Sequence, residues 1–172
     1  LEALAGIKDA VPYLPESAAS RIASLVQALN HDNWRVRRAL INTLPSLAAK
    51  CGRETFESQL LEMFVHSFQD RICQVRMSAI AVLAQLCDLP ANQEGDGSAD
   101  PLFNSDWLLQ KITKRLSELY LSLTYFVYRI TIVQAFEILA ASSVLSPSHM
   151  KVIITFLSEA TKDDVANVRL AA

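Results

Sequence analysis

Apolar residues recur along this chain at spacings of three and four, which is the pattern of helices that bury one face. The clearest stripe places apolar side chains four residues apart: Phe56, Leu60, Phe64 and Phe68. A second stripe follows it: Val75, Ala79, Leu83 and Leu86. Taken along the whole chain, the pattern predicts helices over residues 1–12, 17–30, 33–50, 54–69, 71–88, 104–120, 124–143, 147–161 and 164–172. The sequence therefore predicts an all-α protein.

Residues that suit helix starts stand at the predicted boundaries. Short polar side chains that can accept a hydrogen bond from the first turn precede the apolar stripes: Ser17, Asn33, Asn104 or Ser105, Ser146, and Asp163 or Asp164. Pro147 follows Ser146, as expected of a proline in a first helical turn. Only four glycines occur in the chain, which also favours helix.

The helices repeat as pairs. An aromatic or Val residue followed by Arg recurs near the start of every second predicted helix, and the arginines are Arg37, Arg76, Arg129 and Arg169. Their intervals are 39, 53 and 40 residues, and the long one contains a segment rich in Gly, Pro, Asp and Ser, residues 90–101, which we interpret as an inserted loop. A period near 40 residues with two helices per unit is typical of HEAT and armadillo solenoids (α-α superhelices). The chain 1–172 is thus predicted to be a single solenoid with about four repeats: 17–50, 54–88, 104–143 and 147–172.

Composition and charge limit which classes of partner and which cellular compartment we expect for this chain. The chain of 172 residues is 51% hydrophobic with a net charge of -2, so no overall positive field attracts nucleic acid or an anionic membrane. The most apolar stretch, 130–145, is interrupted by polar residues and is too short to span a bilayer, which predicts a soluble protein. Three widely separated cysteines favour a reducing compartment, cytoplasmic or also nuclear. Both ends resemble the interior of helices, as expected of a piece of a longer chain.

Candidate catalytic and metal-binding motifs are incomplete. Residues 148–151 match Ser-x-x-Lys in outline, but its companion motifs are missing and Ser148 stands at a predicted helix start. Residues 92–97 imitate a calcium loop, yet Phe103 occupies the position that needs a bidentate glutamate. The three histidines share no ligand spacing with cysteines or carboxylates. We therefore predict no enzymatic activity, no cofactor and no metal.

Four blocks of sequence carry a resemblance to a known family. They are HDNWRVRRALINTLPSLAAKCG, QDRICQVRMSAIAVLAQL, LTYFVYRITIVQAFEILA and DDVANVRLAA. In this order they resemble consecutive HEAT repeats in the C-terminal half of the scaffold (A-type) subunit of type 2A Ser/Thr protein phosphatases. The resemblance implies a non-catalytic protein whose intra-repeat turns hold the phosphatase catalytic subunit, while other repeats hold variable regulatory subunits.

Carried over by position, the resemblance assigns a partner-binding residue set in each turn. These residues are Trp34, Arg35, Arg71, Ile72, Cys73, Thr124, Tyr125, Phe126, Asp164 and Val165. Trp and Arg are also the residue types most enriched at binding hot spots. The alternative for Trp34 is a cap over the core between two helices. The inserted loop 90–101 and the prolines near the start depart from the family pattern, so a regulatory subunit of a type 4 phosphatase remains an alternative.

The recurring arginines have a different predicted role. An aspartate precedes each of three of them by five or six residues, and such Asp and Arg residues pair between adjacent HEAT repeats. The predicted structural ladder is Asp32, Arg37, Asp70, Arg76, Arg129, Asp164 and Arg169, with Thr124 at the aspartate position of the third repeat. If the ladder exists, replacing Asp32 by alanine should destabilise the fold. Because Arg37 would face inward, we reject a nucleic-acid-binding patch around it.

Two other functions fit a HEAT solenoid. One is a tubulin-binding TOG-like array, which would present basic or aromatic turns on one edge in several repeats. The other is an adaptor, for example in nuclear transport. Trp34 and Arg35 are the turn residues that fit a TOG array best.

Overall fold

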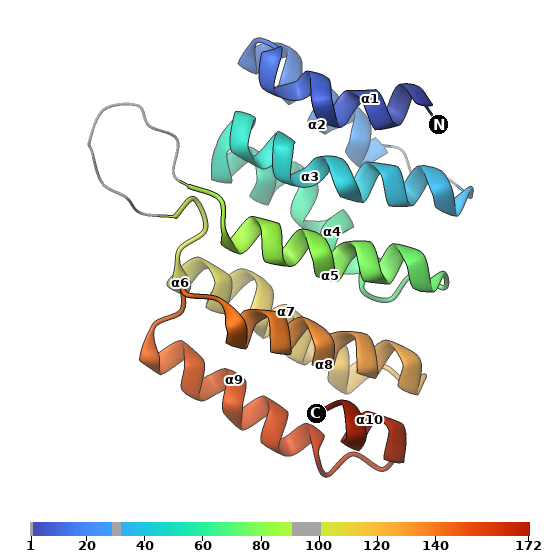
Figure 1. Ribbon diagram of the computed structural model, residues 1–172, viewed down its shortest axis with the longest axis vertical. Coiled ribbons are helices and arrows are strands. Elements are labelled where there is room, and N and C mark those ends of the chain that lie inside the picture. Colours follow the sequence, from blue (N-terminus) through green and yellow to red (C-terminus); the bar gives the residue numbers. More distant parts are fainter. Residues whose placement is uncertain (1, 29–31, 91–100) are drawn as a thin grey trace.

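The computed structural model describes residues 2–28, 32–90 and 101–172 of the chain. Within these ranges the regular elements are helical, apart from one isolated antiparallel bridge between Pro90 and Pro101. The predicted all-α solenoid is confirmed, since the helices stack one above another along the longest axis of the molecule (Figure 1).

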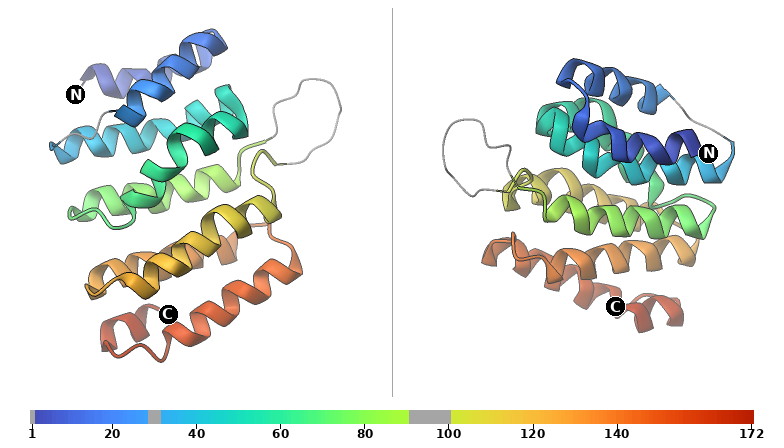
Figure 2. Two further views of the ribbon diagram at one scale, coloured as in Figure 1. Left: turned by 180° about the vertical axis from the view of Figure 1, so that it is seen from behind. Right: turned by 45° about the horizontal axis from the view of Figure 1, so that its top comes forward.

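The helices form two layers. The layer that faces the viewer in Figure 1 consists of α1 (Glu2–Ala10), α3 (Trp34–Thr55), α5 (Cys73–Cys87), α8 (Phe126–Ala141) and, at its lower end, α10 (Ala166–Ala171). The layer seen from behind in Figure 2 consists of α2 (Glu16–Ala28), η2 (Phe56–Leu60) with α4 (Leu61–Ser67), α6 (Ser105–Trp107) with η3 (Leu108–Thr113) and α7 (Lys114–Ser122), and α9 (Pro147–Ala160). A short 3₁₀ turn, η1 (Val11–Tyr13), follows α1. The rear helices α4, α7 and α9 thus each lead into a helix of the front layer through a short turn.

Three of the expected helix caps are confirmed. The side chain of Asn33 accepts the main-chain N–H of Arg35 at 3.0 Å, and Asn104 and Ser146 cap α6 and α9 in the same manner. Two expected caps are wrong. Ser17 lies inside α2, which begins at Glu16, and α10 begins after Val165.

The boundary between the first two repeats lies at a glycine. Gly52 has φ 78° and ψ 176°, a backbone conformation that residues with a side chain rarely adopt. The change of direction at Gly52 ends the straight part of α3 and starts the rear helix of the next repeat. We predicted separate helices ending at 50 and beginning at 54, and the non-helical backbone of Gly52 confirms a break between them within the range labelled α3.

The core lies between the two layers and contains both predicted stripes. All eight stripe residues are buried, and the ring of Phe64 packs edge-to-face against those of Phe56 and Phe68, with centroids 6.1 Å and 5.2 Å away. Phe103 and Trp107 extend this aromatic cluster into the third repeat. The core is therefore continuous across repeats, as stacking of units that cannot bury their apolar faces alone requires.

The predicted inserted loop falls mostly on residues 91–100, which lie outside the described residues. Its two flanks are described and meet: the main-chain N–H of Leu102 donates to the carbonyl of Leu89 at 2.9 Å, beside the Pro90–Pro101 bridge. The second and third repeats consequently stack with their connection closed at its base.

Candidate functional site

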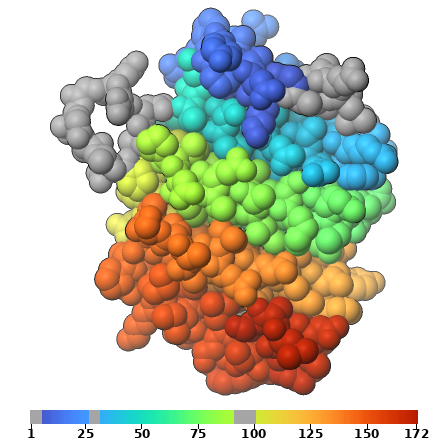
Figure 3. Space-filling view, viewed as in Figure 1, coloured from blue at the N-terminus to red at the C-terminus, as the bar shows by residue number. Residues whose placement is uncertain are grey.

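The turns that lead into α3, α5, α8 and α10 lie along one edge of the molecule, at the right in Figure 1. We name this edge the turn ridge and define it as residues 32–35, 70–73, 123–126 and 163–165. In the space-filling view the colours follow the sequence in successive bands from top to bottom, so each repeat contributes its own band of surface (Figure 3). Every residue predicted to bind a partner belongs to the turn ridge.

The predicted partner-binding residues differ in exposure. Those that are exposed are Arg35, Arg71, Cys73, Thr124, Tyr125, Phe126 and Asp164. Those that are half-buried are Trp34, Ile72 and Val165. Trp34 packs against the core on one side and carries the guanidinium of Arg35 on its ring, 4.7 Å from the centroid. Trp34 thus combines the two roles that the sequence left open, a core cap and an accessible ring.

Behind the turn ridge, Arg37 of the first repeat pairs with Asp70 of the second. Arg37 Nε donates to Asp70 Oδ2 at 2.7 Å and Nη2 donates to Oδ1 at 2.9 Å, the bidentate geometry in which arginine binds carboxylates best. Asp70 Oδ1 also accepts the N–H of Ile72 at 2.8 Å. Burial alone would raise the pKa of Asp70, but the hydrogen bonds from Arg37 and Ile72 hold that pKa below its ordinary value.

Arg129 of the third repeat pairs with Asp163 of the fourth through a single hydrogen bond, without the bidentate geometry of Arg37 and Asp70. Its Nη2 donates to Asp163 Oδ1 at 2.9 Å, and the same carboxylate accepts the N–H of Val165 at 2.8 Å and the hydroxyl of Tyr120. Burial raises the pKa of Tyr120, and the adjacent Asp163 carboxylate raises it further. The side chain that contacts Arg129 is therefore that of Asp163, and not that of the predicted Asp164.

The aspartate of the ladder stands six residues before the arginine of the helix that follows it. Asp70 stands six residues before Arg76, and Asp163 stands six before Arg169. In the third repeat this position belongs to Leu123, so the prediction that Thr124 replaces the aspartate is wrong by one residue. The exposed residues Asp32 and Asp164 contact the arginines through their main-chain carbonyls instead.

These carbonyl contacts form a second regular series. Nη1 of each repeated arginine donates to a main-chain carbonyl in the turn before its own helix, over 2.6–3.2 Å: Arg37 to Asp32, Arg76 to Asp70, Arg129 to Leu123, and Arg169 to Asp163. Three of these arginines also reach the next repeat: Arg37 and Arg129 join two consecutive turns, whereas Arg76 joins its turn to α8.

Arg76 makes that cross-repeat contact without a carboxylate. Its Nε donates to Thr131 Oγ1 at 3.0 Å, and its guanidinium carbon lies 5.3 Å from the ring centroid of Tyr128. Sequence reasoning missed Thr131 and Tyr128 as members of the ladder. Their signal is weak, since both stand among the apolar residues of α8.

The motifs that imitate catalytic sites have structural roles. Ser148 exchanges a hydrogen bond with Ser146, the cap of α9, at 3.0 Å. His149 is fully buried, with Nε2 at 2.8 Å from Thr113 Oγ1 and Nδ1 at 3.2 Å from Ser105 Oγ. Burial lowers the pKa of His149, which favours the neutral imidazole. Among the described residues no three His, Cys, Asp or Glu side chains gather as a metal would require, and the imitation calcium loop lies mostly outside those residues.

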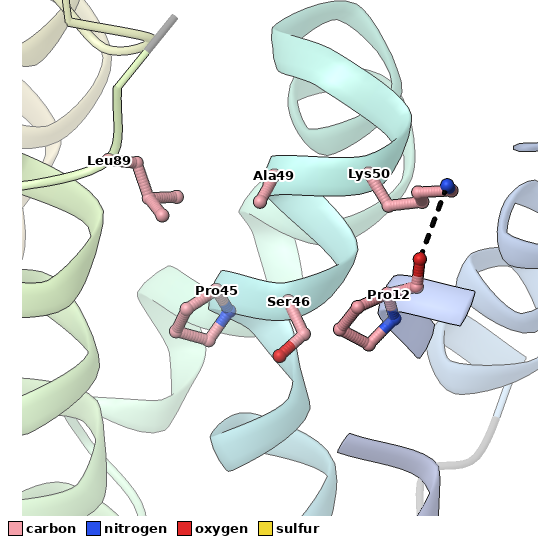
Figure 4. A pocket seen from close by; sticks show the side chains of 6 residues that line it. All are labelled: Pro12, Pro45, Ser46, Ala49, Lys50 and Leu89. Atoms are coloured by element: carbon pink, nitrogen blue, oxygen red, sulfur yellow. Dashed lines mark hydrogen bonds between the residues drawn. The ribbon is translucent and has the colours of Figure 1, made fainter. Parts of the chain in front are cut away.

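An open, mainly apolar groove lies between η1 and α3, away from the turn ridge (Figure 4). It is lined by Pro12, Pro45, Ser46, Ala49, Lys50 and Leu89. Lys50 Nζ is turned aside and donates to the carbonyl of Pro12 at 3.4 Å. The polar members of the lining are thus Ser46 and Lys50, and the rest of the groove is apolar.

Comparison with known proteins identifies the repeat type. Residues 22–51 match the family model described as HEAT repeat, over the end of α2 and most of α3. A comparison with curated proteins gives no match. In the described part of the chain, no helix combines the length and apolarity needed to cross a membrane. The matched repeat and the stacked helix pairs support a HEAT-repeat protein with a role in protein interaction or scaffolding.

Proposed function

We propose that this chain is a non-catalytic scaffold whose turn ridge binds the catalytic subunit of a Ser/Thr protein phosphatase and presents it to a variable regulatory subunit. The proposal combines the resemblance of four sequence blocks to type 2A scaffold subunits with the position of the implied residues. A scaffold of this kind does no chemistry itself. It raises the effective concentration of the phosphatase near the substrates that the regulatory subunit selects.

The observation that carries the proposal is the arrangement of exposed residues on a rigid base. Tyr125 and Arg35 are types enriched at binding hot spots, and both lie on the turn ridge with their side chains exposed. Directly beneath them, Arg37 and Arg129 are held by aspartates of the neighbouring repeats. Because the ladder holds the turns in place before any partner arrives, binding there costs little ordering of the chain.

The second candidate, a tubulin-binding TOG-like array, fits the turn ridge less well. Basic side chains occur in the first two turns, at Arg35 and Arg71, but the third turn presents Tyr125 and Phe126, and the fourth presents Asp164. A tubulin surface, which is acidic, would meet only half of this ridge favourably. An adaptor in nuclear transport has no feature on the ridge in its favour.

The test compares two exposed arginines at opposite ends of α3. Arg35→Ala removes a side chain from the turn ridge, whereas Arg53→Ala, the matched control, removes one from the far end. The immobilised chain is incubated with purified phosphatase catalytic subunit or with tubulin. We expect the wild type and Arg53→Ala to bind the catalytic subunit equally, and Arg35→Ala to bind about 5–30-fold more weakly, which corresponds to about 1–2 kcal/mol.

Two outcomes would overturn the proposal. If the wild-type chain binds tubulin and not the phosphatase, the TOG-like function replaces it. If Arg35→Ala and Arg53→Ala weaken phosphatase binding equally, the partner does not use the turn ridge. Urea unfolding of both variants excludes loss of fold as the cause, since we expect their free energies of unfolding to lie within about 0.5 kcal/mol of the wild type.

A further inference from the structure

One ladder arginine, Arg76, is buried without a counter-charge. It keeps only 7% of its surface exposed. Its partners among the described residues are the hydroxyl of Thr131, the carbonyl of Asp70 and the ring of Tyr128, none of which carries a negative charge. A buried cation is costly unless a carboxylate compensates it, and the two other cross-repeat arginines of the described chain each have an aspartate.

The unused atom of Arg76 is Nη2, the atom that binds the aspartate in the other two pairs. Nη2 of Arg37 and Nη2 of Arg129 each donate to an aspartate Oδ1 at 2.9 Å. Nη2 of Arg76 has no hydrogen-bond partner among the described residues. Among the described residues, the side-chain nitrogen that is both fully buried and without a hydrogen-bond partner is Nε of Arg129. Nη2 of Arg76 also lacks a partner there but is not fully buried. Nη2 of Arg76 therefore keeps some exposure to solvent, within the 7% of the residue's surface that is exposed.

The turn in front of Arg76 is the most apolar part of the turn ridge. Leu123 occupies the aspartate position, and Tyr125, Phe126 and Val127 follow with 70%, 38% and 37% of their surfaces exposed. The ring of Tyr125 lies 5.9 Å from that of Tyr128, edge to face, and Tyr128 in turn carries the Arg76 guanidinium. The ring of Tyr128 thus links the cation to the exposed aromatic rim.

The corresponding positions in the second and fourth turns are less apolar, and the first turn has Trp34 and Arg35 there, in front of an arginine that is paired with Asp70. Cys73 and Gln74 in the second repeat, and Ala166 and Asn167 in the fourth, stand where the third repeat has Phe126 and Val127. The combination of a partly exposed guanidinium nitrogen with a rim of exposed apolar side chains is therefore specific to the third turn.

We infer that the third turn docks a partner protein that directs an aspartate or glutamate side chain at Nη2 of Arg76 and lays an apolar residue against Tyr125 and Phe126. The partner's carboxylate would pair with Arg76 as the carboxylates of Asp70 and Asp163 pair with Arg37 and Arg129 within the chain. This inference rests on the proposed function and deepens it, because it assigns a chemistry to the segment that the turn ridge receives. The apolar rim and the net charge of -2 favour a protein segment over nucleic acid as the occupant.

The test compares two substitutions of Leu123, which stands where the neighbouring repeats have the ladder aspartate. The two new side chains, Asp and Asn, are nearly isosteric with each other. Leu123→Asp places a carboxylate before Arg76 from within the chain, whereas Leu123→Asn makes the same loss of apolar surface without the charge. A display library of random peptides is selected on the wild-type chain. We expect enriched peptides to carry Asp or Glu beside an apolar residue, and to bind Leu123→Asp at least about tenfold more weakly than Leu123→Asn.

Several results would overturn the inference. They are a selection that enriches no peptide, enriched peptides without an acidic residue, and equal binding of the enriched peptides to the two variants. The phosphatase catalytic subunit is measured against the same proteins as a separate readout. If acidic peptides distinguish the two variants but the wild type binds no phosphatase, the proposed function fails and the docking chemistry stands. If the phosphatase binds but no peptide distinguishes them, the inference alone fails.

Discussion

Replacing Asp70 by alanine is the most direct test of the ladder. The carboxylate of Asp70 accepts two hydrogen bonds from Arg37 and one from the N–H of Ile72, and alanine removes all three hydrogen bonds at once. Arg37 would keep its bond to the carbonyl of Asp32 but would lose the carboxylate that compensates its charge. The variant therefore leaves the Arg37 guanidinium between two repeats without the Asp70 carboxylate.

The expected cost follows from the burial of the pair. Removing one partner of a buried ion pair costs about 3–5 kcal/mol. The side chains of Arg37 and Asp70 are 18% and 11% exposed, so water compensates part of the loss and the lower end of that range applies, about 3 kcal/mol. Loss of the bond to Ile72 adds about 1 kcal/mol. We expect Asp70→Ala to lower the free energy of unfolding by about 4 kcal/mol in total.

Urea unfolding followed by circular dichroism measures this difference, and Asp32→Ala is its matched control. Asp32 contacts the same arginine, but through its main-chain carbonyl, which alanine retains. We therefore expect Asp32→Ala to stay within about 0.5 kcal/mol of the wild type, contrary to the expectation from the sequence. Arg37→Ala and the double variant complete a cycle whose coupling energy should reach about 2 kcal/mol.

The reasoning would be refuted by an Asp70→Ala variant that unfolds within about 1 kcal/mol of the wild type. A coupling energy near zero would refute it as well, because the two side chains would then contribute independently. Equal destabilisation by Asp32→Ala and Asp70→Ala would show that the turn backbone, rather than the carboxylate, carries the contact.

Three further predictions concern other parts of the fold. The folded-state pKa of buried His149 lies below its unfolded value, so the unfolded chain takes up the proton first as the pH falls. The stability present above about pH 6.5 should therefore decrease as the pH drops toward the folded-state pKa, and His149→Gln should lack this part of the pH dependence. A free energy of unfolding that rises on acidification would contradict this prediction. Cys73 is exposed, while burial raises the pKa of Cys51 and raises that of Cys87 to about 11, so a thiol reagent should label one cysteine rapidly, and rapid labelling that survives in Cys73→Ser would disprove this. Gly52→Ala should lower the free energy of unfolding by about 1–3 kcal/mol because of its positive φ, and an unchanged urea midpoint would refute the kink.

The sequence was most informative where contacts are local. The recurrence of arginine near 40 residues predicted the repeated helix pairs, and helix periodicity placed Phe64 and Leu83 in the core, because both signals depend on regular spacing along the chain. The cap residues Asn33 and Ser146 were found for the same reason, since each bonds within its own first turn.

The sequence failed where a side chain reaches another repeat. Asp163 and Asp164 are adjacent, and only the path of the turn determines which carboxylate faces Arg129. The one-residue error at Leu123 has the same origin. The contact of Arg76 with Thr131 joins residues 55 apart, and nothing in the local pattern marks a threonine in α8 as the acceptor.

The closed base of the 90–101 connection has a practical consequence for engineering. Since Leu89 and Leu102 are bonded to each other, the stacking of the second on the third repeat does not depend on how many residues lie between them. The entropic cost of lengthening such a loop grows only slowly with its length. The base also lies at the end of α5 opposite the turn ridge. A fluorescent domain or an affinity tag inserted in this connection would therefore report on the solenoid while leaving its binding edge unobstructed.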